Sequence, residues 1–399
     1  MQEISWKDNL RIAWLGSFLT GACISLVVPF MPIFVEQLGV EPSQVTFYSG
    51  LAISVSAISA ACVSPLWGIL ADRYGRKPMM IRAGLAMTIT MGGLAFVPNV
   101  YWLLALRLLN GVFTGFVPNA TALIASQVPK DKSGYALGTL SSGVVAGTLT
   151  GPFVGGMIAE VFGIRNVFLM VGGFLFLAAI LTIFFIKEDF QPVPKEKALP
   201  TKELFTSVKY PYLLFNLFAT SFVIQVAAQS VGPILALYIR DLGQNENLLF
   251  VSGLIVSSMG LSSMMSSGVM GRLGDKVGNH RLLIVAQAYS ALIYLLCANA
   301  STPLELGIYR FLFGLGTGAL VPGINALLSR MTPKAGISRV FAFNQVFFYL
   351  GGVIGPLAGS VVAEQFGYHS VFYATAACVA LSCLFNLIQF RTLLKVKEI

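Results

Sequence analysis

Twelve long stretches without a charged residue constrain this chain more than any other feature of its sequence. Each stretch has at least 19 residues free of Asp, Glu, Lys and Arg, and a helix needs about 20 apolar residues to cross the hydrocarbon core of a membrane. The stretches are 12–35, 42–71, 83–106, 108–129, 133–159, 166–186, 210–239, 247–271, 282–304, 311–329, 340–363 and 365–390. Barrel strands would instead alternate in polarity over about ten residues. The sequence therefore predicts an all-α membrane protein of twelve transmembrane helices.

The basic residues predict how these helices are oriented. Only 11% of the residues are charged, against about 25% in a soluble domain. If the N-terminus is cytoplasmic, the segments on that side hold 22 of the 26 basic residues, and the opposite side holds only Arg165 and Arg240. Basic residues concentrate on the cytoplasmic side of membrane proteins. We therefore expect a multi-pass protein of the cell membrane with both termini in the cytoplasm. Topology accounts for the net charge of +9, so no nucleic-acid partner is expected.

One hydrophilic segment divides the chain into two halves. Residues 187–209 contain nine charged residues and three prolines, a composition typical of a linker. We expect an N-terminal six-helix bundle over 1–186, a cytoplasmic linker over 187–209 and a C-terminal six-helix bundle over 210–399.

Three motifs recur in the same order in the two halves. They are Gly68-x-x-x-Asp72-x-x-Gly75, Arg107-x-x-x-Gly111 and Gly151-Pro152-x-x-Gly155, which return 203, 203 and 204 residues later. This regularity predicts two pseudo-symmetric bundles of parallel topology. Repeats of this kind place a substrate site near the middle of the membrane, between halves that rock against each other.

The residues of these motifs resemble those of a known family. The loop with Gly68, Asp72, Arg73, Gly75, Arg76 and Lys77 resembles the signature of the major facilitator superfamily, and Arg107-Leu-Leu-Asn-Gly111 resembles its second signature. The series Gly147, Gly151, Pro152, Gly155 and Gly156 resembles the motif of exporters in the drug:proton antiporter branch. Residues 21–32 are similar to the first-helix signature of twelve-helix drug exporters. The resemblance covers the whole chain and implies a multidrug efflux transporter.

Asp72 is the predicted centre of a conformational latch. A carboxylate there can accept hydrogen bonds from the N-terminus of an incoming helix. The resemblance implies that this helix begins near Arg339 and that the latch favours the outward-facing state. Asp131 could pair with Arg73 or Arg76 to complete the network, and Asp275 repeats Asp72 in the second half. Arg82 is interpreted as an ordinary solvated charge.

Arg107 lies inside a hydrophobic stretch, where a guanidinium is costly and usually faces the protein interior or a watery cavity. It could tune a proton carrier, contact substrate, or be a structural hydrogen-bonding post, and these alternatives stay open. The glycines of the exporter motif permit close helix packing, and Pro152 introduces a bend. We expect them to form a tight interface with the helix over 247–271.

All 17 acidic residues are expected in loops or at the ends of helices, although many drug:proton antiporters that resemble this chain have a membrane-embedded carboxylate. The candidates for proton exchange are Asp72, Asp131, Asp275, Glu36 and Glu160.

Several polar and aromatic residues within the stretches could line a substrate cavity, or could equally bond one helix to another. They are Phe18, Ser25, Phe113, Asn119, Phe222, Gln225, Gln229 and Asn325.

No nucleotide-binding loop of the Gly-x-x-x-x-Gly-Lys-Ser/Thr type is present, and no metal cluster or catalytic constellation stands out. We therefore expect no cofactor and no enzyme activity. The sequence predicts a monomeric secondary active transporter in the lipid bilayer that exports small amphipathic molecules in exchange for protons. The alternatives are a sugar or metabolite exporter of the same superfamily and a membrane sensor without transport activity.

Overall fold

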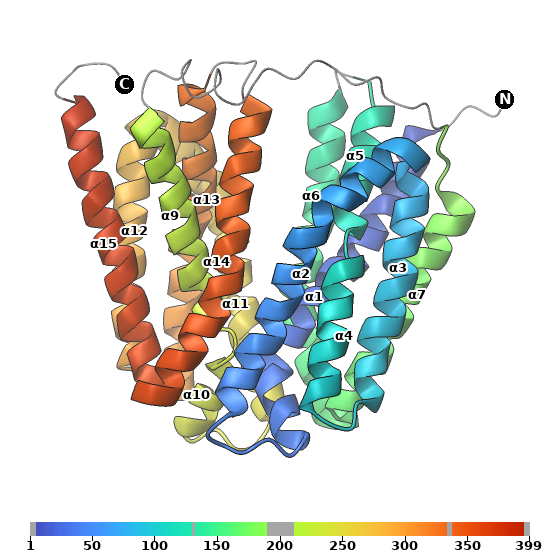
Figure 1. Cartoon of the computed structure of the whole chain (residues 1–399). Coiled ribbons are helices and arrows are strands. Elements are labelled where there is room, and N and C mark those ends of the chain that lie inside the picture. Colours follow the sequence, from blue (N-terminus) through green and yellow to red (C-terminus); the bar gives the residue numbers. More distant parts are fainter. Residues whose placement is uncertain (1–4, 130–131, 190–210, 333–336, 395–399) are drawn as a thin grey trace. The chain divides into compact units, whose positions relative to one another are not determined.

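The computed structural model of the chain describes residues 5–129, 132–189, 211–332 and 337–394. These residues form helices joined by short turns, without a strand among them. Within the described residues, twelve helical segments are long and apolar enough to cross a membrane. The prediction of an all-α protein with twelve spans is confirmed (Figure 1).

The chain forms two compact units. The first contains α1 (Trp6–Gln37), α2 (Val45–Tyr74), α3 (Arg76–Gly93) with the 3-10 turn η1 (Leu94–Phe96), α4 (Val100–Phe113), α5 (Phe116–Gln127), α6 (Ser133–Phe162) and α7 (Ile164–Phe185). Residues Asn245–Ser257, which include the beginning of α11 (Leu248–Val277), also belong to it. The predicted linker at 187–209 lies almost wholly outside the described residues, so the predicted domain boundaries stay a prediction.

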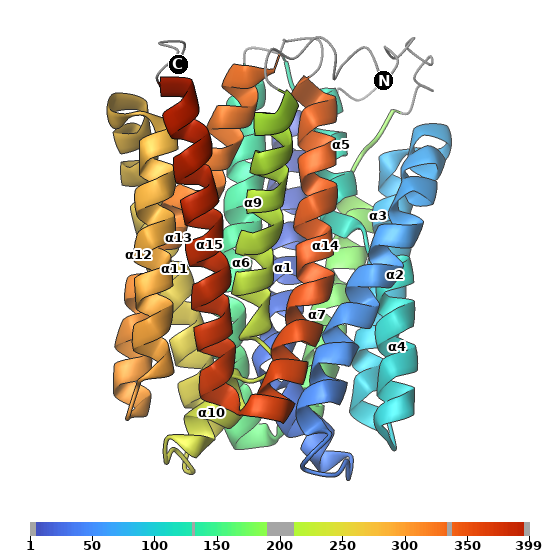
Figure 2. The same cartoon turned by 60° about the vertical axis from the view of Figure 1, so that its left-hand side comes forward.

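The second unit contains the remainder of α11 and the other helices of the C-terminal half. These are α9 (Pro211–Ser230), α10 (Leu235–Asp241), α12 (Asn279–Ala298), α13 (Pro303–Met331), α14 (Ile337–Phe366) and α15 (Tyr368–Leu394). Helices that correspond in the two halves pack in the same way. In the first unit α3 lies along α7, and in the second α12 lies along α15 (Figures 1 and 2).

Three predicted helices differ from the structure. The stretch 83–106 contains the end of α3, the turn η1 and the beginning of α4. The stretch 108–129 forms two helices, α4 and α5, because the chain breaks at Thr114 and Gly115. The membrane span that they form begins at Val100 and so includes Arg107. The predicted stretch began at residue 108, because it was defined by the absence of charged residues. The stretch 210–239 ends its membrane span at Ser230, and the short α10 follows after a turn.

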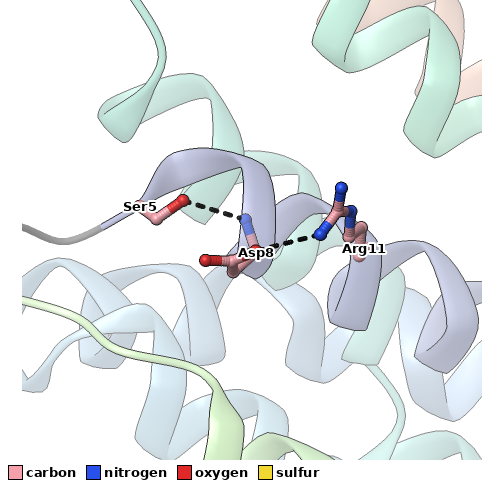
Figure 3. Close-up of polar contacts among 3 residues, drawn as sticks. All are labelled: Ser5, Asp8 and Arg11. Carbon is pink, nitrogen blue, oxygen red and sulfur yellow. Dashed lines mark hydrogen bonds and ion pairs between the residues drawn. The ribbon is translucent and has the colours of Figure 1, made fainter.

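The first helix begins with a side-chain cap. The backbone N–H of Asp8 donates to Oγ of Ser5 at 3.4 Å, which satisfies one of the free amides of the first turn. Nη1 of Arg11 lies 3.2 Å from Oδ1 of Asp8 (Figure 3). Both side chains of this ion pair are largely exposed, so the pair contributes at most about 1 kcal/mol.

A buried polar clasp joins the beginning of α1 to the end of α7. Asn9, which is 2% exposed, donates to the backbone oxygen of Lys187 at 2.6 Å and accepts from its N–H at 2.9 Å. Gln127, at the end of α5, bonds to both residues. The clasp therefore holds the start of the first helix, the end of α5 and the chain after α7 at one point.

A second buried network ties together the helices of the second unit. Asn386 of α15 donates to Thr220 and to Gln287 at 3.0 Å each, and its oxygen accepts from Asn216 at 2.8 Å. Gln287 also donates to Ser382 at 3.0 Å. These side chains, most of them buried, satisfy one another, so they bond α9, α12 and α15 together.

Candidate transport site

The signature loop is a tight turn between α2 and α3 that depends on a glycine. Gly75 has φ +102°, a value that other residues rarely adopt, and its N–H donates to the oxygen of Ala71 at 3.0 Å. In the second unit Gly278, 203 residues later, has φ +100° between α11 and α12. The turn therefore recurs with the sequence motif.

The N-terminus of α3 is capped by a residue that the sequence analysis did not select. Glu188, just beyond α7, accepts hydrogen bonds from the backbone N–H groups of Arg76 at 2.8 Å and of Lys77 at 2.7 Å. A carboxylate at a helix N-terminus neutralises free amides and interacts favourably with the helix dipole. Its signal in the sequence was only that it follows the last apolar stretch of the first half. The cap fixes the end of the signature loop to the end of α7.

The proposed partners of the latch are less completely described. Asp131 lies outside the described residues, as do the side chains of Asp72 and Asp275. Arg73 is exposed and lies over the Tyr74 ring at 5.4 Å. No described atom lies within 4 Å of the position that a Cβ of Gly68 would take. The latch at Asp72 therefore stays a prediction.

Arg107 is buried at the meeting point of α2, α3 and α4. Arg107 is only 8% exposed. Its Nε donates to the oxygen of Ala52 at 3.0 Å, and its Nη1 lies 3.8 Å from Sδ of Met91. Its own oxygen accepts from Ser56 at 2.6 Å. In this conformation the guanidinium bonds one helix to another, which is the structural alternative of the sequence analysis. A role in transport stays a prediction.

The rest of the second signature brings the same helices close together. Asn110 donates to Thr90 of α3 at 3.1 Å. A Cβ on Gly111 would collide with Oγ of Ser59 and the oxygen of Ser56 on α2, and Ser59 donates to the oxygen of Leu108 at 2.9 Å. The signature therefore permits α4 to lie directly against α2.

The second unit repeats this packing but leaves its arginine less satisfied. Ser262 donates to the oxygen of Phe311 at 2.7 Å, and a Cβ on Gly314 would collide with Ser262 and Met259. Arg310 is 4% exposed, and its Nε and Nη1 have no hydrogen-bond partner within the described part of the chain. The two arginines occupy equivalent places without equivalent bonding.

Three glycines of the exporter motif face α1. A Cβ on Gly147 would meet Phe18 and Ala22, one on Gly151 would meet Ser25 and Ala22, and one on Gly155 would meet Leu26. The side chains that are absent here let the two backbones touch, as at other helix crossings in membranes. The same contact recurs between α9 and α14, where Gly351, Gly355 and Gly359 would meet Phe222, Val226 and Ser230. These glycines and their partners each lie 204 residues after the corresponding residues of α6 and α1.

Two residues of the motif, Pro152 and Gly156, contact α11. A Cβ on Gly156 would lie 2.6 Å from the oxygen of Leu249 and 3.1 Å from Cα of Phe250, and one on Gly253 would collide with the oxygen of Pro152. Glu160 accepts from the N–H of Leu249 at 3.3 Å. The expected interface with the helix over 247–271 thus involves Pro152 and Gly156, whereas the other glycines contact α1.

The cavity candidates lie in three groups. Phe18 and Ser25 are half-buried on α1 beside the glycines of α6. Phe113 and Asn119 flank the break between α4 and α5, and Asn119 donates to the oxygen of Gly115 at 2.7 Å. The remaining candidates are the half-buried Phe222, Gln225 and Gln229 on α9, which lie against α14, and Asn325 on α13. Each group lies within one unit, and a role in substrate binding stays a prediction.

The interpretation of Arg82 as a solvated charge is wrong. Its guanidinium carbon lies 3.4 Å from the centre of the Trp67 ring, and Nη2 donates to the oxygens of Phe113 and Thr114 at 3.4 and 3.2 Å. The sequence showed Arg82 at the edge of an uncharged stretch, but the break that receives it is a tertiary feature. Among the described residues no group of three His, Cys, Asp or Glu side chains could hold a metal ion.

Comparison with known proteins identifies the family. Residues 13–252 and 217–397 match the family model described as Major Facilitator Superfamily. Over all 399 residues of both chains, the sequence is 85% identical to the "Multi-drug resistance efflux pump PmrA" of Streptococcus pneumoniae. It is 51% identical to the PmrA homolog of Lactococcus lactis, with 100% of this chain and 98% of the relative covered. Identity to the multidrug resistance protein MdtG of Escherichia coli is 45%, over 96% and 94% of the two chains.

A solved structure shares the fold at low sequence identity. An inward-facing bacterial homolog of the human lysosomal transporter Spinster superposes with a TM-score of 0.84, 14% identity and 99% of both chains covered. The recurrent motifs, the twelve spans and these matches agree. The chain belongs to the major facilitator superfamily and is a multi-pass protein of the plasma membrane.

Proposed function

We propose that this chain is a multidrug efflux transporter, which exports amphipathic small molecules by alternating access in exchange for protons. The observation that carries the proposal is the 85% identity, over the full length of both chains, to a protein named as a multidrug resistance efflux pump. Relatives at 51% and 45% identity are named for the same kind of activity.

The packing within each unit supports a mechanism in which rigid bundles move. In both units a long helix pair touches along its backbones through glycines: α1 with α6, and α9 with α14. Contacts of this kind are close and specific, so each pair moves as one body. Alternating access by rocking of such bodies requires no internal rearrangement of the pairs.

Three further elements of the proposal rest on the sequence. The 22 basic residues on one side favour cytoplasmic termini. Proton coupling is proposed because the exporter motif resembles that of drug:proton antiporters, with Asp72, Asp131, Asp275, Glu36 and Glu160 as candidate carriers. We propose that the transporter acts as a monomer.

Inverted membrane vesicles test the proposal directly. Vesicles that contain the protein should accumulate ethidium when respiration imposes a proton gradient, and an uncoupler should abolish the accumulation. Vesicles without the protein are the control. Accumulation that survives the uncoupler and instead follows a sodium gradient or added nucleotide would refute proton coupling. Multidrug export would be refuted if the vesicles accumulate neither ethidium nor an uncharged amphipathic dye.

The latch has a matched pair of variants. We expect Asp72→Asn to insert normally but to lose most efflux, because the proposed latch needs a negative charge at a helix N-terminus. Asp8→Asn removes a carboxylate that makes an exposed ion pair with Arg11, and it should pump as the parent does. Equal efflux per folded molecule from both variants would eliminate the latch at Asp72.

A further inference from the structure

The membrane span formed by α4 and α5 contains a break that the second unit lacks. α4 ends at Phe113, Gly115 has φ +133°, and α5 begins at Phe116. The span in the second unit that corresponds by sequence repeat is the continuous helix α13, with Gly318 at the equivalent position packed against Ser266 of α11. The last carbonyl groups before such a break have no partners within their own helix, and in a membrane they must find them elsewhere.

Two side chains provide those partners. Nε1 of Trp67 donates to the oxygen of Val112 at 2.7 Å, and Nη2 of Arg82 donates to the oxygens of Phe113 and Thr114. The guanidinium stacks on the indole ring at 3.4 Å, a cation–π arrangement in which tryptophan is the strongest partner. Its positive charge also lies at the negative end of the α4 dipole. We call this pair the Trp67–Arg82 cap.

The cap and the break occur together. At the positions 203 residues later the sequence has Met270 and Val285, neither of which can donate a hydrogen bond from its side chain. Val285 is 64% exposed, so its side chain does not take the half-buried place that Arg82 has. The cap is therefore a departure from the internal repeat and not a consequence of it.

The position of the cap links two parts of the first unit. Trp67 immediately precedes Gly68 on α2, and Arg82 follows Lys77 on α3, so the two members enclose the signature loop. Both bond to the same end of α4. The end of α4 is therefore bonded to both helices that the signature loop joins, α2 through Trp67 and α3 through Arg82.

From this arrangement, and on the basis of the proposed function, we propose that Trp67 and Arg82 are positioning residues of the transport cycle. They couple the signature loop to the break in the helix that also contains Arg107 and Asn110. Nε and Nη1 of Arg82 are buried without a hydrogen-bond partner in the described residues, so stacking and the two bonds of Nη2 hold the guanidinium in place. The coupling acts on the rate of the conformational change and leaves substrate binding unchanged.

Arg165 is a matched control within the same unit. Its Nη1 and Nη2 donate to the oxygens of Ala95 and Val97 at 2.8 and 3.1 Å, and its guanidinium lies 5.8 Å from the Phe34 ring. Like Arg82 it caps backbone carbonyls and lies near an aromatic ring, but it is far in sequence from the signature loop. Arg165→Gln should lower the amount of folded protein without altering transport per folded molecule.

The experiment compares the parent with Arg82→Gln, Arg82→Lys, Trp67→Phe and Arg165→Gln. For each, the maximal rate and KM of uncoupler-sensitive ethidium efflux are measured per folded molecule, together with the Kd of ethidium for purified protein. Arg82→Gln should lower the maximal rate at least about tenfold, the lower end of the loss for one hydrogen bond from a charged group, because Nη2 makes two such bonds; Kd should be unchanged. Arg82→Lys retains the charge but not the flat face, so it should recover part of the rate, and Trp67→Phe should lie between Lys and the parent.

Hydrogen exchange keeps the outcomes distinct. In Arg82→Gln the amides of the signature loop and those after Gly115 should exchange faster together. A parent that pumps no dye refutes the proposed function, and exchange then decides the cap: acceleration at the break alone would refute the coupling. Equal rates per folded molecule for Arg82→Gln and Arg165→Gln also overturn it. If Arg82→Gln does not fold, Arg82→Lys and Trp67→Phe decide the question in its place. A maximal rate per folded molecule equal to that of the parent in both would overturn the proposal, whereas a lower rate with an unchanged Kd would support it.

Discussion

The glycine contact between α1 and α6 predicts that adding a single methyl group to one of these glycines would push the two helices apart. In Gly151→Ala, the new Cβ would lie 2.5 Å from the oxygen of Ala22 and 3.1 Å from its carbonyl carbon, where ordinary contact begins at 3.4 Å. The backbones must therefore move apart by about 0.9 Å, the difference between 3.4 and 2.5 Å. Overpacking of this kind costs about 1–3 kcal/mol. Ala is itself about 1 kcal/mol better than Gly in a helix, so the net loss is smaller than the overpacking cost.

Gly138→Ala isolates the packing cost. Gly138 lies in the same helix, and no described atom lies within 4 Å of the position of its Cβ. Both variants gain the same helix propensity, so the difference in stability between them equals the overpacking cost. In a unit of about 200 residues, 1–3 kcal/mol corresponds to a difference in Tm of about 2–12 °C.

The assay is thermal unfolding of purified protein in one detergent, with efflux per folded molecule measured in vesicles. We expect Gly138→Ala to match or exceed the Tm of the parent and Gly151→Ala to fall below it. Equal Tm values for the two variants would refute the conclusion that the α1–α6 backbones are in contact at Gly151.

The remaining predictions concern single side chains. Glu188→Gln should raise hydrogen exchange at the first amides of α3, because the lost charge weakens the cap by about 0.3–1 kcal/mol; unchanged exchange would contradict the cap. Arg107→Lys should insert but lose much of its transport per folded molecule, because Lys lacks the planar set of donors, and Arg107→Ala should lose nearly all of it. If both instead lose activity only in proportion to folded protein, Arg107 is a structural post. Asn386→Leu removes the centre of a buried network and should lower the free energy of unfolding by about 1–3 kcal/mol, measured by thermal unfolding, and an unchanged Tm would show that its partners find other bonds. Gly355→Ala should lower Tm less than Gly151→Ala, because its Cβ would lie 2.8 Å from the nearest backbone oxygen; an equal or larger loss would show that the second unit is the more tightly packed.

The fold could be predicted from the sequence because membrane insertion depends on local composition. A helix must be apolar over its own length to cross the bilayer, so the spans are visible without tertiary information. The repeat could also be predicted, because the glycines that permit close packing must recur with the helices that they face. Gly151 and Gly355 show this directly.

The site was less accessible to prediction because its contacts join residues far apart in sequence. Glu188 caps α3 across more than a hundred residues, and nothing local distinguishes it from Asp189. Arg82 was misinterpreted because its environment depends on a break in α4–α5. That break was invisible because Thr114-Gly115 has the same residues as Thr317-Gly318, which lie in a continuous helix.

The clasp at Asn9 has a consequence for how the first unit is connected. Because Asn9 bonds both the N–H and the oxygen of Lys187, the chain just after α7 is held beside the beginning of α1. The polar contact thus adds a fixed point at one end of the packing between α1 and α7. Any change that lengthens or shortens the chain between α7 and Lys187 would therefore have to break these bonds.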